Sequence, residues 1–91
     1  MSKASREILL TVLEEERGRD TDLQRISSEY NRVSTMEERL QILDALFAVA
    51  SADAVISKHE VEQIRNIADL LWISNPEYLG VRDRYRERIE R

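Results

Sequence analysis

The stretch of residues 46–72, LFAVASADAVISKHEVEQIRNIADLLW, constrains the fold more than any other part of the chain. Apolar residues at helical spacing run up to Ala52, and a new helix begins at Ser57 after a very short connection. Glu60 follows Ser57 by three residues, which is the spacing of a capping box. Two helices are therefore expected to meet at a tight, acidic corner.

Helical periodicity extends over the rest of the chain. In the first helix an apolar stripe is formed by Ile8, Leu9, Val12 and Leu13, and we expect the helix to end near Gly18. In the third helix the expected buried face consists of Leu40, Leu43, Leu46, Phe47, Val49 and Ala50. Further helix starts are predicted at Thr21 with Gln24, at Ser34 with Glu37, and at Asn75-Pro76. The pattern predicts an all-α chain, a five-helix orthogonal or antiparallel bundle.

Composition limits the class of protein. Ninety-one residues with 42% hydrophobic residues are enough for a single domain over 1–91, and two glycines with one proline argue against an all-β chain. The chain has no cysteine, which excludes disulfides and thiolate metal sites. A net charge of −4 argues against nucleic-acid binding. Without an apolar run near the roughly 20 residues of a membrane span, we expect a cytoplasmic protein.

The acidic corner has two chemical interpretations. Asp53 could accept hydrogen bonds from free N–H groups at the next helix start, and Glu60 could reach back to the N–H of Ser57. Alternatively, Asp53 and Glu60 could bind a divalent cation such as calcium, which takes several oxygen ligands. Two carboxylates fall short of a full calcium shell and no EF-hand loop is present, so capping is favoured.

The run LDALFAVASADAVISKHEVEQIRNIADLLWIS resembles the tellurite-resistance TerB-like family of bacterial helical domains. That family carries the patterns A-D-G-x-I-x-x-x-E and L-L-G-I-S. The matching residues here are Ala52, Asp53, Ile56 and Glu60 for the first pattern, and Leu70, Leu71, Ile73 and Ser74 for the second. The resemblance is best over residues 34–85 and weaker back to about residue 23.

The resemblance implies an all-helical domain linked to tellurite or other stress responses. The family's acidic residues have been considered for metal binding, and only Asp53 and Glu60 carry that role over to this chain. Such domains commonly contain two similar helical halves, and this chain resembles the second half. A half without its partner would expose apolar surface, so we expect a homodimer in which a second copy covers it.

Two residues depart from the family patterns, because Ala54 and Trp72 stand where the family has glycine. Trp72 could cover the edge of the core, packing near Tyr78 or Phe47, and burial is favoured because tryptophan is seldom left bare. It could instead be an exposed anchor for a partner, since tryptophan is enriched at binding hot spots. Trp72 and Tyr78 are the candidate interaction residues.

The last eleven residues, VRDRYRERIER, contain five arginines against three acidic residues. If the helix continues through them, Arg84, Arg88 and Arg91 share one side, and Glu87 can pair with Arg91. A solvated face is the favoured interpretation, and any membrane contact would be peripheral.

No phosphate-binding glycine loop and no nucleophile with an adjacent base appears in the sequence. We therefore expect a non-catalytic interaction or accessory module with a protein partner, a second copy included, and no cofactor. A divalent-cation-binding module at Asp53 and Glu60 is the alternative.

Overall fold

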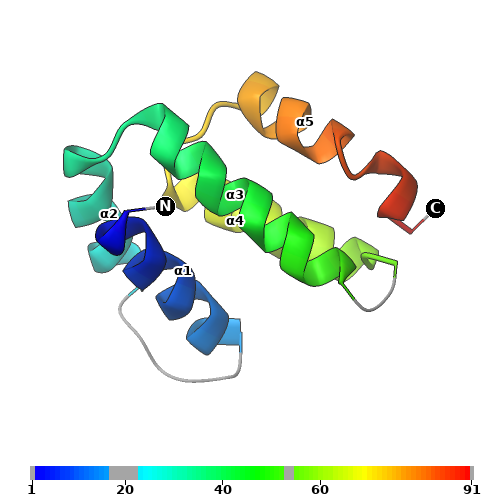
Figure 1. Ribbon diagram of the computed structural model, residues 1–91, viewed down its shortest axis with the longest axis horizontal. Helices are drawn as coiled ribbons and strands as arrows, with labels where there is room; N and C mark the ends of the chain where they lie inside the picture. Colours follow the sequence, from blue (N-terminus) through cyan, green and yellow to red (C-terminus); the bar gives the residue numbers. More distant parts are fainter. Residues whose placement is uncertain (1, 17–22, 53–54, 91) are drawn as a thin grey trace.

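The computed structural model describes residues 2–16, 23–52 and 55–90 of the chain, and these residues form an assembly of α-helices (Figure 1). The elements are α1 (Lys3–Glu16), α2 (Leu23–Val33), α3 (Met36–Ser51), α4 (Lys58–Leu70), α5 (Asn75–Asp83) and a short 3-10 turn, η1 (Arg86–Arg88). The all-α prediction with five helices is confirmed. The expectations for Gly18, Thr21, Asp53 and Ala54 fall outside the described residues.

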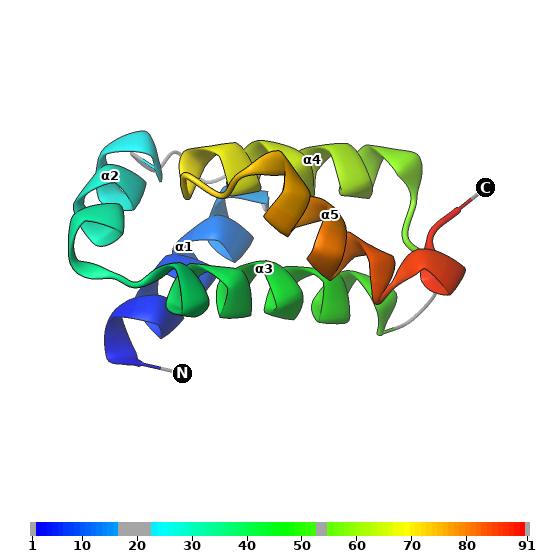
Figure 2. The same ribbon diagram turned by 90° about the horizontal axis from the view of Figure 1, so that it is seen from above.

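Helix α3 lies at the centre of the arrangement. It contacts α1, α4 and α5, while α2 contacts α1 and α4. Helices α3 and α4 run side by side in opposite directions, as a short connection requires, and α5 crosses the pair (Figure 2). The result is a small bundle in which every helix has a covered face.

Helix α3 starts one residue later than the sequence suggested. The N-cap is Thr35, whose Oγ1 accepts from the Glu38 N–H at 3.1 Å while the Thr35 N–H donates to Glu38 Oε1 at 3.0 Å. Ser34 instead belongs to the end of α2: its N–H donates to the Tyr30 carbonyl, and its Oγ accepts from Arg39 Nη1 at 3.4 Å. The hydrogen bond from the Thr35 N–H lowers the pKa of the Glu38 carboxyl. Helix α5 begins at Asn75, as the Asn75-Pro76 pair predicted, and Ser74 is its N-cap.

Buried polar side chains connect three helix ends. The Arg39 guanidinium donates to the Asn31 carbonyl at 2.9 Å, and the Asn31 side-chain amide donates to the Leu70 carbonyl at 2.7 Å. Both carbonyls belong to the last turns of helices, where no intrahelical N–H is available to them. Two side chains thus satisfy backbone groups that would otherwise be buried without partners.

The core is continuous and all five helices contribute to it. Its largest fully buried side chain is Phe47, whose ring lies 6.2 Å from that of Tyr78 and 5.4 Å from that of Tyr85. The buried apolar residues are Ile8, Val12, Leu23, Tyr30, Ile42, Leu43, Leu46, Phe47, Ile56, Ile64, Ile67, Ala68, Leu71, Ile73, Tyr78 and Val81. Val49, predicted to share the buried face of α3, is instead 52% exposed, because it lies on the edge of the stripe that faces solvent.

The segment of residues 84–90, called the strap below, does not continue α5. Helix α5 ends at Asp83, the chain makes the turn η1, and Ile89 then pairs with Ile56 in a parallel β-bridge. The Tyr85 hydroxyl donates to Asp44 Oδ1 at 3.0 Å, and its ring stacks on Phe47. The expectation of a helical arginine stripe is therefore wrong for Arg84 and Arg88, while Arg91 lies outside the described residues.

Replacing Phe47 by alanine tests the centre of the core. Phe47→Ala should lower the free energy of unfolding by about 3–5 kcal/mol, because a large cavity opens between α3, α5 and the strap. Val49→Ala, on the exposed side of the same helix, should change it by less than about 0.5 kcal/mol. Urea denaturation followed by circular dichroism measures both, and equal effects would contradict the assigned core.

The Tyr85 hydroxyl makes part of the stability depend on alkaline pH. Burial, followed by the hydrogen bond to the Asp44 carboxylate, raises the pKa of Tyr85, so folding favours its protonated form. An unfolded tyrosine ionises near pH 10, so this contribution is complete below about pH 10 and is lost as the pH rises through the folded-state pKa. The stability difference between the wild type and Tyr85→Phe should therefore stay constant up to about pH 10 and shrink as the pH rises further, as measured by urea titrations. A pH-independent difference would contradict it.

Candidate functional site

The acidic corner enters α4 through a capping box. Ser57 has an extended backbone, with φ −71° and ψ 159°, and its Oγ accepts from the Glu60 N–H at 3.1 Å. The Ser57 N–H donates in return to Glu60 Oε1 at 3.2 Å. The predicted capping role of Glu60 is confirmed, and one of its carboxylate oxygens is engaged in it.

The predicted cation site cannot be assembled from the described residues. Within residues 2–16, 23–52 and 55–90, no three histidine or acidic side chains converge as metal ligands would. Asp53 lies outside these residues, so the structure places only Glu60 of the proposed pair. A calcium site at the corner stays a prediction from the sequence.

Trp72 lies just beyond the end of α4, in a conformation that is unusual for its type. Its φ is 55°, the only positive φ of a non-glycine residue in the part of the chain that the structure describes. The Trp72 N–H donates to the Asp69 carbonyl at 3.1 Å and the Ile73 N–H to the Ala68 carbonyl at 3.0 Å. This pair of hydrogen bonds is the Schellman motif, whose left-handed position is usually glycine.

The indole of Trp72 is directed to the surface. The residue is 56% exposed, whereas its neighbours Leu71 and Ile73 are both buried. The expectation that Trp72 covers the core edge is thus wrong. Because Leu71 and Ile73 are both buried, the left-handed residue between them projects outward. Asn31 adds to the constraint through its hydrogen bond to the Leu70 carbonyl.

Tyr78 does not share the surface of Trp72. It is 3% exposed, its ring contacts Phe47, and the Arg65 guanidinium lies over it with Cζ 5.8 Å from the ring centre. Burial raises the pKa of its hydroxyl. Of the two candidate interaction residues, Trp72 is accessible and Tyr78 is a core residue.

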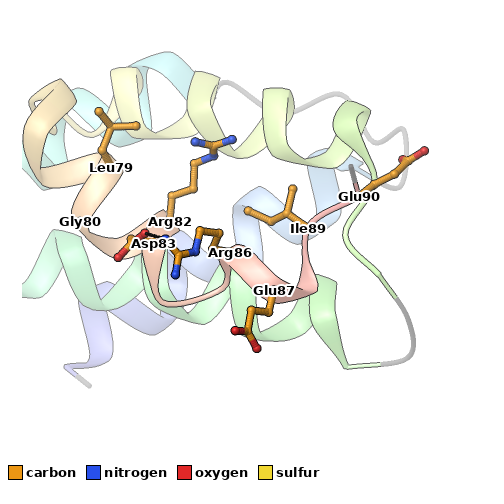
Figure 3. Close-up of a pocket in the computed structure, with 8 residues that line it drawn as sticks. All are labelled: Leu79, Gly80, Arg82, Asp83, Arg86, Glu87, Ile89 and Glu90. Atoms are coloured by element: carbon orange, nitrogen blue, oxygen red, sulfur yellow. Dashed lines mark ion pairs between the residues drawn. The ribbon is translucent and has the colours of Figure 1, made fainter.

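A concavity of about 850 Å³ lies between α5 and the strap (Figure 3). It is lined by Leu79, Gly80, Arg82, Asp83, Arg86, Glu87, Ile89 and Glu90. Its charged side chains are partly paired, since Arg86 lies 3.7 Å from Asp83. The concavity leaves one flank of the strap open to solvent.

The strap was missed by sequence reasoning, although it holds the entry to α4. The Ile56 N–H donates to the Arg88 carbonyl at 2.7 Å, the Glu90 N–H donates to the Ile56 carbonyl at 2.8 Å, and the Lys58 N–H donates to Glu90 Oε2 at 3.3 Å. One signal could have pointed to it: Tyr85 and Ile89 are the only apolar residues in an otherwise charged segment.

Comparison with known proteins identifies the family. Residues 1–83 match the family TerB, described as tellurite resistance protein TerB. No curated protein and no solved structure matches the chain. None of the described helices is long and apolar enough to cross a membrane. The match begins before residue 23 and includes α1 and α2, so it is wider than the half-domain that the motifs suggested. Since it spans well over half of the 91 residues, the chain belongs to the TerB family.

Proposed function

We propose that this tellurite-resistance-type domain is a non-catalytic cytoplasmic interaction module that binds a second copy of itself through Trp72. The observation that carries the proposal is the exposed indole at a left-handed backbone position. The sequence suggested self-association for another reason, namely that a half-domain would expose an apolar surface. That reason no longer applies, because the described helices cover one another's apolar faces.

The energetics of Trp72 favour a functional origin. A left-handed conformation costs an L-residue about 1–2 kcal/mol, and glycine avoids that cost. A half-exposed indole gains little in return from packing within its own chain. Strained residues of this kind persist where the surroundings fix them, and they cluster at functional sites. Tryptophan is also among the residues that contribute most to binding when an interface buries them.

Four carboxylates that a catalytic site could have used are engaged in hydrogen bonds within the fold. Glu38 and Glu60 accept N–H groups in capping boxes, and Glu90 accepts the Lys58 N–H. Asp44 accepts the Tyr85 hydroxyl. These carboxylates close helix ends and hold the strap, so their chemistry is used in folding.

With a second copy as the partner, one interface contains two Trp72 side chains. In a two-fold arrangement the same patch faces itself, so each tryptophan contributes to the interface from both sides. The flanking backbone is held by the Schellman hydrogen bonds and by Asn31. The anchor is therefore rigid before binding, which reduces the entropic cost of association.

Glycine at position 72 should stabilise the monomer. Trp72→Gly is expected to raise the free energy of unfolding by about 1 kcal/mol relative to Trp72→Ala, because only glycine relieves the left-handed strain. Urea denaturation at submicromolar protein, where association is negligible, measures the difference. If Trp72→Gly is the less stable of the two, the strain assigned to this position is absent.

The same variant should weaken self-association. We expect sedimentation equilibrium to show a monomer–dimer equilibrium at micromolar concentration for the wild type, with Trp72→Gly weakening it by about thirtyfold, as loss of a hot-spot side chain does. Leu10→Ser, which changes an exposed apolar residue on α1, is the matched control and should leave the equilibrium unchanged. A monomeric wild type at 100 μM (about a hundredfold above the expected range) would reject the second copy as partner.

A further inference from the structure

The entry to α4 presents a row of backbone groups that an extended chain segment can bind. Ile56 offers both its N–H and its carbonyl, and Lys58 offers the first free N–H of the helix. We call these two residues, with Ser57 between them, the seat. Ile56 is completely buried beneath the bound strap. The strap thus shows directly which chemistry the seat accepts.

The segment that the seat binds has an extended backbone and carries an aliphatic residue followed by an acidic one. The strap pairs with Ile56 through main-chain hydrogen bonds of 2.7 and 2.8 Å, which recognise an extended backbone of any sequence. Selectivity comes from two side chains. Ile89 packs half-buried against the core, and the Glu90 carboxylate accepts the Lys58 N–H, where the helix dipole favours a negative charge.

The strap is well suited to being displaced. Arg88 and Glu90 are exposed, and Ile89 and Glu90 line the concavity beside α5, so the flank of the strap is open (Figure 3). The strap also follows residue 83, the last residue of the TerB match. Tyr85 provides a second attachment of the strap, because its ring stacks on Phe47.

We propose that the seat is a docking site for an extended aliphatic–acidic segment of a partner protein, and that the strap is its built-in competitor. A tethered competitor acts at an effective concentration in the millimolar range, so it occupies the seat at rest. The apparent affinity for the partner is reduced in proportion to the fraction of molecules with an open seat. Release of the strap exposes the site without any change in the helices.

The proposal is tested with the full chain and a labelled peptide of residues 84–90. Ile89→Glu, which removes the aliphatic contact of the strap and leaves the seat intact, should bind the peptide at least tenfold more tightly than the wild type does. Glu90→Lys, a milder change that removes the bond to Lys58, should act in the same direction. Fluorescence anisotropy gives the affinities, and circular dichroism confirms that the variants keep their helices.

A matched variant of the seat distinguishes specific docking at the seat from nonspecific binding by a destabilised chain. In the Ile89→Glu chain, adding Lys58→Pro removes the N–H that Glu90 accepts, while proline is tolerated at the first position of a helix. Ser57 already has the extended backbone that a following proline requires. Peptide affinity should fall about tenfold, as expected for loss of a hydrogen bond to a charged group.

Three results would overturn the proposal. The released variants bind the peptide no more tightly than the wild type does, or Lys58→Pro has no effect on peptide affinity. The third is that a peptide with lysine in place of Glu90 binds as tightly as the unmodified peptide. If both released variants lose their helical signal, the peptide is titrated at millimolar concentration into the isotopically labelled wild type. The amide resonance of Ile56 must then shift, and an unchanged resonance also overturns it. Trp72→Gly should leave peptide binding unchanged. The docking proposal is therefore tested independently of the proposal that the domain self-associates through Trp72.

Discussion

The carboxyl ends of two helices, α2 and α4, are closed at one place by two buried side chains. The hydrogen bonds from Arg39 to the Asn31 carbonyl and from Asn31 to the Leu70 carbonyl join α3, α2 and α4. A buried carbonyl without a partner destabilises a fold by about 1–3 kcal/mol. The junction holds the last residue of α4 against α2 and α3, and the Schellman turn that carries Trp72 and leads to α5 follows directly from that residue.

The periodicity of the sequence predicted the helices and most of the core, since burial on a helix follows its 3.6-residue repeat. Ser57 and Glu60 were identified as a capping box because all its partners lie within one turn. The same logic placed the start of α3 one residue early, at Ser34 instead of Thr35. Two adjacent hydroxyl residues are equally good caps in the sequence, and the contacts of Ser34 with Tyr30 and Arg39 distinguish them in the structure.

The candidate surfaces were less predictable, for two physical reasons. The exposure of Trp72 follows from a left-handed turn, and local sequence rules assign that turn to glycine rather than to tryptophan. The strap is held by contacts with residues more than 30 positions away, such as Ile56 and Asp44, so no local pattern encodes it. The charges between Arg82 and Glu90 are equally compatible with a solvated helix, which is the structure that the local sequence pattern favours.

Helix α4 separates the two candidate surfaces, with the seat at its first residue and Trp72 just past its last. Thirteen helical residues span about 20 Å, and a packed helix of this length does not stretch or bend appreciably. The helix therefore fixes the distance between the seat and Trp72. Two bound partners would be held at a fixed spacing, and a single partner that engages both ends must present its contacts at that same distance.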